Sequence, residues 1–343
     1  MSESMKEKTD AAMSRWQRMG PIVTLLLLSP VIGEVMSGAT RLSYIFVLVP
    51  EIMVWGCGAL LIRELVRRWS GGWTSMLLMG FGLSIAEEFV IQQTSIAPLP
   101  WLGDRPAYGR VWGVNWPWFI FMLGYEAIWI VLVPVQVTEL LFPARRRNAW
   151  LRTRGLFISG AVFLVGSCIA WFAWTQQARP NAFHVPVYYP PMATVLAGAV
   201  AIALLGAAAY AVRGVDRVRV EGAAPEPWVV ALVGLLMGLP WYGLMVLVFV
   251  PGVTLPLGIP MLAAAVWAGG VFVLIRHWSR SAAWGDIHRW AICLGALLVC
   301  MTGGFLGAGS WPRMDVVGKA VLNVLAVVAM AVLAARIRRR AAG

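Results

Sequence analysis

Charged residues are scarce in this sequence: Asp, Glu, Lys and Arg make up 13% of its 343 residues, against 60% hydrophobic residues. Soluble globular domains carry roughly 25% charged residues. Together with a mean hydropathy of +0.75, this scarcity excludes an ordinary soluble protein. We therefore expect an all-α fold, a polytopic integral membrane helical bundle whose main partner is the lipid bilayer.

Cysteine and histidine are also rare. The four cysteines lie in apolar stretches without CxxC spacing, and no two of the three histidines have the spacing of metal ligands. These residues are Cys57, Cys168, Cys293, Cys300, His184, His277 and His288. Their number and spacing indicate neither a disulfide framework nor a zinc site. If a metal binds, we expect an oxygen-ligated divalent cation such as calcium, magnesium or manganese.

Nucleic-acid binding is excluded by the distribution of the positive charge. The net charge is +12, but the basic residues form short clusters between long apolar stretches. Such clusters set the orientation of a multi-pass protein in its membrane. Two of them, at residues 145–147 and 336–340, could also touch anionic lipids. No small-residue cleavage site follows the first apolar run, so we expect an uncleaved first span.

Stretches of roughly twenty apolar residues, the length of a membrane-spanning helix, occur about ten times. The expected spans are Pro21–Ala39, Ser43–Leu65, Trp73–Thr94, Asn115–Leu141, Gly155–Trp174, Met192–Val212, Trp228–Val250, Leu257–Ile275, Arg289–Ser310 and Val316–Ala335. Assigning the loops alternately to two sides puts 22 of the 28 Lys and Arg residues on one side and five on the other, with Lys319 inside a span. The positive-inside rule then predicts a multi-pass protein of the plasma (inner) membrane with both termini in the cytoplasm.

Acidic residues divide the chain into unequal parts. Every glutamate expected inside the membrane precedes Pro143, and the later acidic residues fall in loops or at span edges. We therefore expect a cytoplasmic N-terminal tail over residues 1–20, four spans with an acidic layer over residues 21–141, and six scaffold spans with a basic C-terminal tail over residues 142–343.

The stretch Ser84–Ser95, SIAEEFVIQQTS, places two adjacent carboxylates inside an expected span. On a continuous helix, positions i, i+4, i+8 and i+11 form one stripe. Here the stripe consists of Ser84, Glu88, Gln92 and Ser95. One face of this helix is therefore expected to be polar at membrane depth.

Five glutamates from four spans are expected in one layer. They are Glu34, Glu51, Glu87, Glu88 and Glu126. At 1.5 Å per helical residue, the first four lie roughly 8–12 Å below the outer surface, with Glu126 slightly deeper. Five carboxylates facing lipid would cost on the order of 10 kcal/mol, so they are expected to face each other or a water-filled cavity.

Carboxylates gathered in a poorly hydrated site repel each other, so this cluster is expected to bind protons, a metal ion or a small cationic ligand. We predict Glu34, Glu51, Glu87, Glu88, Gln92 and Glu126 as the substrate- or cation-binding residues. The alternative is that neighbouring hydroxyl, amide and backbone groups satisfy each glutamate separately, as contacts between helices. Five glutamates at one depth favour the functional interpretation.

The outer loop Ile96–Trp118 combines Trp and Tyr residues with several prolines. Indole and phenol rings prefer the level of the lipid headgroups. This loop is therefore expected to be either an interfacial aromatic belt or a cap over the helix ends, and the belt, a simple anchor, is the favoured interpretation.

The run Glu87–Gln92 resembles the EExxxR signature of the CPBP family of intramembrane proteases, which is related to the CAAX prenyl endopeptidases. In that family the paired glutamates activate a water beside a metal that is held partly by histidines on later helices. The resemblance implies Glu87 and Glu88 as catalytic residues. Gln92 stands in place of the arginine, and no FxxxH or HxxxN run follows. The overall layout is similar to that of multi-pass membrane proteins of actinobacterial type.

Three functions remain open at this point. The first is a cation- or proton-coupled transporter whose charge carriers are the glutamates. The second is a metal-dependent intramembrane hydrolase with Glu87 or Glu88 as general base. The third is a non-catalytic immunity, sensor or assembly subunit in which the polar layer fixes helix packing. We rank them in this order, and leave open whether the protein is an enzyme.

Overall fold

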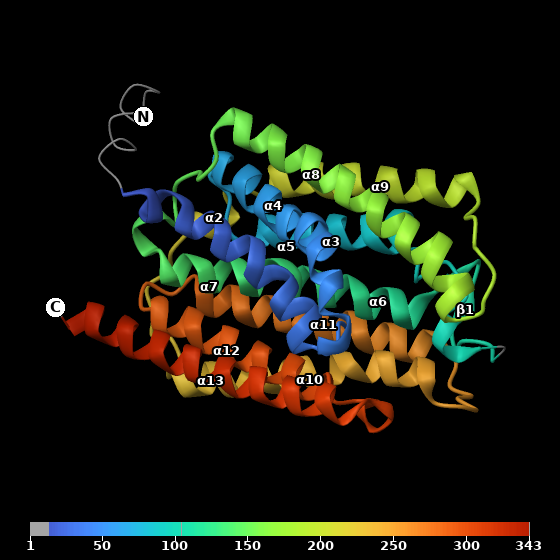
Figure 1. The fold of residues 1–343 in the computed structure, drawn as a ribbon. Helices are drawn as coiled ribbons and strands as arrows, with labels where there is room; N and C mark the ends of the chain where they lie inside the picture. Colours follow the sequence, from blue (N-terminus) through green and yellow to red (C-terminus); the bar gives the residue numbers. More distant parts are fainter. Residues whose placement is uncertain (1–13, 104, 343) are drawn as a thin grey trace.

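The computed structural model describes residues 14–103 and 105–342, so most of the expected N-terminal tail lies outside the described residues. This part of the chain is a bundle of long helices with a single two-stranded hairpin, β1 (Arg110–Val111) and β2 (Val114–Asn115) (Figure 1). The all-α prediction is confirmed.

Each of the first four spans contains a π-helical segment, which lies between helical segments in the second and fourth spans and at the end of the helix in the first and third. The symbol η denotes a π- or 3-10-helical segment. The segments are α2 (Arg15–Pro30) and η1 (Val31–Met36); η2 (Leu42–Val47), α3 (Leu48–Glu51), η3 (Ile52–Gly56) and α4 (Cys57–Arg68); α5 (Trp73–Ala86) and η4 (Glu87–Ile91); α6 (Trp116–Tyr125), η6 (Glu126–Leu132) and α7 (Val133–Leu141).

The remaining spans are more regular. They are α8 (Thr153–Trp171) with the π-helical η8 (Phe172–Ala182), α9 (Met192–Ala211), α10 (Pro227–Phe249), α11 (Gly258–Ser279), α12 (Asp286–Gly303) and α13 (Arg313–Ala342). Short 3-10 turns lie in the connections at η5 (Pro100–Leu102), η7 (Pro143–Arg145), η9 (Val215–Arg217) and η10 (Ala308–Ser310).

In the described part of the chain, nine helices are long and apolar enough to cross a membrane, as expected of a multi-pass membrane protein. The tenth expected span, α12, is also a helix but is not one of the nine. It begins at Asp286 and carries Arg289 in its first turn, so its first turn is polar.

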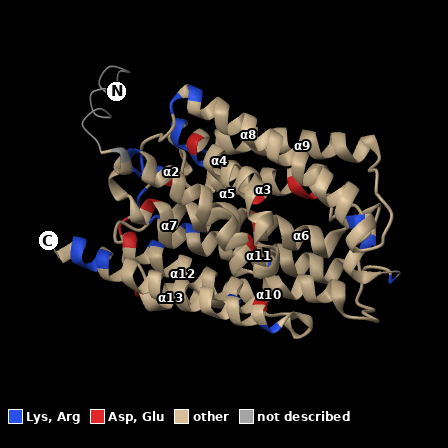
Figure 2. Cartoon of the chain, viewed as in Figure 1, with Lys and Arg blue, Asp and Glu red and all other residues tan. Residues whose placement is uncertain are grey.

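The helix ends gather at two ends of the bundle. Helix α2 begins and helix α13 ends at the same end (Figure 1), where Lys and Arg residues are concentrated (Figure 2). Arg340 Nη1 lies 3.0 Å from the carbonyl oxygen of Leu140, which ties α13 to α7 there. We call this the basic end; it comprises residues 63–72, 143–152, 213–226, 276–289 and 336–342. The opposite end, the cap end, comprises residues 37–42, 96–115, 183–191, 251–257 and 304–312.

Pro134 and Ser29 together connect three of the first four spans. Pro134 has no N–H, so the carbonyl of Ile130, four residues earlier, has no helical donor. The Ser29 hydroxyl lies 2.7 Å from that oxygen and 3.0 Å from the carbonyl oxygen of Trp55. The carbonyl that Pro134 leaves without a helical donor thus accepts from a side chain that links α2, η3 and η6.

Glycines allow α10 and α12 to pack closely, as small residues often do between membrane helices. A Cβ at Gly234 would lie 3.0 Å from Ile292 Cδ1 and 3.1 Å from its carbonyl oxygen, whereas a Cβ at Gly243 on the same helix would meet nothing within 4 Å. Position 234 therefore has no room for a larger side chain.

Substitution Gly234→Val is expected to lower the free energy of unfolding by about 1–3 kcal/mol, because overpacking forces the two helices apart. Thermal unfolding of the purified protein in detergent measures the effect. Gly243→Val is the matched control, since it adds the same side chain to the same helix in open space. Equal losses in both variants would show that the α10–α12 contact is not as tight as described.

Candidate functional site: an acidic cluster

All five glutamates of the expected layer lie in or beside π-helical segments. Glu34 lies within η1, Glu51 directly precedes η3, Glu87 and Glu88 begin η4, and Glu126 begins η6. π-helical segments are rare and are frequently found at functional sites. Four of them in one layer therefore mark this region as the candidate site.

The fold brings these glutamates within electrostatic range of one another. Glu34 interacts with Glu51 and Glu87, and Glu87 interacts with its neighbour Glu88. Glu126 interacts with Glu34, Glu87 and Glu88. We call these five residues the acidic cluster. Four different spans contribute to it, and the described residues contain no Lys or Arg in ion-pair contact with it.

Several carboxylate oxygens of the acidic cluster are buried without a hydrogen-bond partner among the described residues. Glu126 is 0% exposed and Glu87 2% exposed, and neither oxygen of either side chain has a partner. One oxygen each of Glu51 and Glu88 is in the same state, as is the hydroxyl of Ser84. A buried ionised carboxylate without a partner is strongly unfavourable. These oxygens therefore need a proton or a bound cation.

Glu88 is held by the residues that follow its helix. The hydroxyls of Thr94 and Ser95 each donate to Glu88 Oε2 over 2.6 Å, and Trp118 Nε1 donates to Thr94 Oγ1 over 2.9 Å. The other oxygen, Oε1, has no partner among the described residues. One oxygen of this carboxylate is thus held by two hydroxyls, and the other has no protein partner that would compete with a proton or cation.

The polar stripe predicted for a continuous helix from Ser84 to Ser95 is wrong in its second half. Helical structure ends at Ile91, and Gln93 has a left-handed backbone with φ of 62°. Ser95 reaches Glu88 because the chain folds back, not because it lies eleven residues along a helix. Gln92 is half-buried, and its side chain makes no hydrogen bond within the described part of the chain.

The loop from Ile96 to Trp118 folds back over the end of the third span, next to Glu88: Trp118 donates to the Thr94 hydroxyl, and the Asn115 N–H donates to the Ser95 carbonyl. Arg110 donates to the carbonyl oxygens of Ile96 and Ala97 over 2.5 and 3.1 Å, and Arg179 donates to that of Pro98 over 3.0 Å. Ile96 and Ala97 are buried. Of the two interpretations from sequence, the structure therefore favours the cap, although Trp112 at the hairpin tip is 91% exposed.

Sequence analysis missed several polar neighbours of the cluster. Thr40 donates a hydrogen bond to Glu51 Oε1, and the Tyr125 hydroxyl donates to the carbonyl of Gly33, next to Glu34. Lys319 of α13 is 3% exposed and donates to the carbonyl of Met36. Of these contacts, only that of Lys319 has a signal in the sequence, because a charged residue stands there inside an apolar span. The lysine also shows that the expected scaffold half reaches the vicinity of Glu34.

Two other glutamates provide an internal comparison. Glu64 and Glu139 are both 0% exposed at the basic end, but arginines surround them. Glu139 lies 2.7 Å from Arg67 Nη2 and 3.1 Å from Arg289 Nη2. Glu64 lies 2.7 Å from Arg63 Nη1 and also accepts two backbone N–H groups. The chain therefore pairs its buried structural glutamates, and leaves the acidic cluster unpaired.

A preformed metal site is not evident. Among residues 14–103 and 105–342, no group of three or more His, Cys, Asp or Glu side chains is arranged to hold a metal ion. His184, in the loop after η8, is exposed. An oxygen-ligated divalent cation remains a prediction from sequence.

Comparison with known proteins adds no assignment: no protein-family model, no curated protein and no solved structure matches this chain. The resemblance of Glu87–Gln92 to the CPBP signature stays a prediction. The function is therefore argued from the site itself.

Proposed function

We propose that this protein is a membrane carrier in which the acidic cluster binds a proton or small cation and couples its movement to that of a substrate. One observation carries the proposal: five carboxylates from four spans lie within electrostatic range of one another without a basic partner among the described residues, and six of their oxygens are buried without a hydrogen bond. Unpaired acidic groups inside a membrane protein mark ion pathways and proton relays.

The comparison with Glu64 and Glu139 argues against a purely structural role for the cluster. A glutamate that only joins helices gains from a fixed partner, as both of these residues do. A site that must release its ion works better without a fixed partner, because a permanent ion pair would hold the carboxylate in a single charge state. The absence of fixed partners in the acidic cluster is therefore what we expect of a site that binds and releases a proton or cation.

Orientation completes the proposal. The positive-inside rule puts the basic end, with both termini, in the cytoplasm of a cell bounded by a plasma (inner) membrane. The cap end then faces outward, and the cap over Glu88 separates the cluster from the external solution. Access would require movement of this loop or of the π-helical segments, which are the irregular parts of the four spans.

The test uses the protein reconstituted in liposomes that contain a pH-sensitive dye. With an imposed pH or cation gradient, wild-type protein is expected to carry a measurable flux, and Glu87→Gln/Glu88→Gln is expected to reduce it to the level of empty liposomes. Glu221→Gln, a change at an exposed loop residue, is the control and should behave as wild type.

Metal analysis of the same preparations separates the other two functions. Equal flux in wild type and the double variant would contradict the carrier. Stoichiometric metal that is lost in the double variant, together with cleavage of a peptide or lipid, would support the hydrolase instead. A double variant that only unfolds at lower temperature would support the structural subunit.

A further inference from the structure

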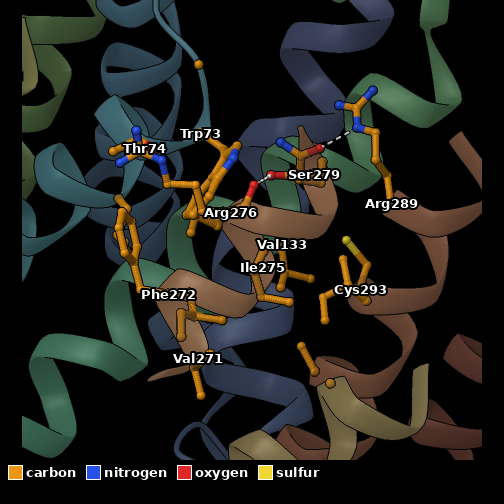
Figure 3. Close-up of a pocket in the computed structure, with 18 of the residues that line it drawn as sticks. Trp73, Thr74, Val133, Val271, Phe272, Ile275, Arg276, Ser279, Arg289 and Cys293 are labelled. Carbon is orange, nitrogen blue, oxygen red and sulfur yellow. Dashed lines mark hydrogen bonds between the residues drawn. The ribbon is translucent and has the colours of Figure 1, made fainter. Parts of the chain in front are cut away.

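A large groove runs along η6, apart from the acidic cluster. Its volume is about 2330 Å³, and α5, η6, α7, α10, α11 and α12 contribute to its walls. Figure 3 shows lining residues from α5, α7, α11 and α12. Much of its lining is apolar, including Phe81, Ile128, Leu132, Met237, Trp241 and Phe272. None of the five glutamates lines it. The groove is therefore a second candidate site, separate from the first.

Helix α11 forms a loosely held outer wall. Of its 22 residues, only Pro260 and Ala264 are buried. Its attachments include a hydrogen bond of 2.9 Å from Trp267 Nε1 to the Met237 carbonyl and a ring contact between Trp73 and Phe272 at 5.4 Å. An apolar molecule in the groove would supply the apolar contacts that this helix lacks.

Arginine is heavily over-represented where the groove reaches the basic end. Ten arginines line the groove, against four acidic residues. The acidic residues are largely engaged: Glu139 with Arg67 and Arg289, Asp286 with Arg146, and Asp216 with the backbone N–H and hydroxyl of Thr74. The excess positive charge at this end is therefore not neutralised by the carboxylates that line the groove.

Arg276 and Arg280 are the arginines best placed for a ligand. Both are half-buried, Arg276 on the last turn of α11 and Arg280 directly after its end, and within the described ranges neither side chain has a protein acceptor. The Nε of Arg280 is completely buried without a partner. Figure 3 shows Arg276 beside Trp73, with the apolar side chains of Val271 and Ile275 in the same groove. Two unpaired guanidinium groups thus adjoin an apolar channel.

The dimensions of the groove favour a long-chain amphiphile over a small solute. Its volume exceeds the roughly 300–1000 Å³ of pockets for drug-sized ligands. From Met261 to Arg276 the groove follows α11 for about 22 Å, at 1.5 Å per residue. One leaflet of the hydrocarbon core is only about 15 Å deep. A chain that occupied the groove would extend past the middle of the membrane.

We propose that this groove binds a lipid with a phosphate headgroup, its chains along the apolar channel and its phosphate at Arg276 and Arg280. Arginine presents a planar set of donors that matches phosphate oxygens, and it is the preferred residue for that group where the site is partly dehydrated. The proposal does not depend on the acidic cluster, so either can fail without the other.

The test is native mass spectrometry of the purified full-length chain in detergent, with dioleoyl phosphatidic acid as the probe. Arg276→Gln/Arg280→Gln is expected to weaken formation of the one-to-one complex at least tenfold. Arg154→Gln/Arg213→Gln removes two arginines near the same end but outside the groove, and is expected to bind as wild type does. Ala268→Trp, which fills the apolar channel, tests the chain-binding part separately and should also weaken the complex.

Two further arms identify the ligand. Dioleoylglycerol, which has the same chains without phosphate, is expected to bind at least tenfold more weakly than phosphatidic acid, and inorganic phosphate is expected not to compete. Equal loss in the two arginine double variants would show non-specific binding to lipid around the protein and would overturn the proposal. Competition by inorganic phosphate would overturn it in favour of a site for free phosphate.

Discussion

Glu139→Gln is expected to cause the largest loss of stability among single changes to the buried glutamates, about 3–5 kcal/mol in the free energy of unfolding, because it removes one partner of a buried ion-pair network. Arg67 and Arg289 lie 2.7 and 3.1 Å from Glu139 Oε2, and Arg63 Nε lies 3.4 Å from Oε1. The neutral amide would leave these arginines close together with too little negative charge. Equilibrium unfolding of the purified protein measures the loss.

Glu221→Gln makes the same chemical change at an exposed loop position and serves as the control. It should alter the free energy of unfolding by less than about 0.5 kcal/mol, as surface substitutions usually do. If Glu139→Gln is as mild as this control, the arginines at the basic end are not held by Glu139, and the comparison with the acidic cluster loses its basis.

Glu126→Gln is expected to have the opposite profile: unchanged or increased stability, and loss of ion-coupled flux. Glu126 is 0% exposed, neither of its oxygens has a hydrogen-bond partner among the described residues, and it interacts with three other glutamates. An amide of the same shape removes a potential charge that no partner stabilises. It also removes the group that takes up and releases a proton or cation.

Two measurements on one preparation decide this prediction. Equilibrium unfolding should give a free energy equal to or above that of wild type, and liposome flux should fall to the level of empty vesicles. A variant that loses as much stability as Glu139→Gln while its folded fraction still carries flux would show that Glu126 is structural. Glu126→Asp keeps the charge, so partial recovery of flux is expected from it.

The bundle could be predicted from sequence because hydropathy depends on composition over about twenty residues. All ten expected spans are helices, including α12, whose 18 residues begin with a polar turn and which is not one of the nine described helices apolar enough to cross a membrane. The depth of the acidic layer follows from counting residues along these helices. To predict that the glutamates converge, one must know which helix faces meet. A single sequence indicates this only indirectly, because carboxylates left facing lipid would be unfavourable.

The end of the third span was predicted incorrectly for a local reason. Thr94 and Ser95 were assigned to a helix, but both hydroxyls bond to Glu88 instead. Serine and threonine side chains that reach nearby acceptors compete with helical structure. The left-handed backbone at Gln93 then turns the chain into the cap. Hydropathy does not distinguish these outcomes, because both bury the same residues.

The π-helical segments and the groove were not predictable from the sequence. A π-helical segment depends on which carbonyl groups find donors in other spans, as Ile130 does with Ser29. The groove depends on how far α11 stands from its neighbours, which its apolar composition does not reveal. In the sequence, Arg276 is only one of the basic loop residues that set the orientation of the protein. Its lack of a protein acceptor becomes visible only in three dimensions.

The central claim is that the acidic cluster exchanges a proton or cation, and infrared difference spectroscopy of the carboxyl C=O stretch tests it most directly. The protein in lipid nanodiscs is compared at acidic and alkaline pH, with and without added sodium, potassium, magnesium or calcium. We predict a reversible carboxyl signal in wild type that decreases in Glu87→Gln and in Glu126→Gln, but not in Glu221→Gln. An identical signal in all four proteins would contradict the account, because the glutamates of the cluster would then exchange nothing.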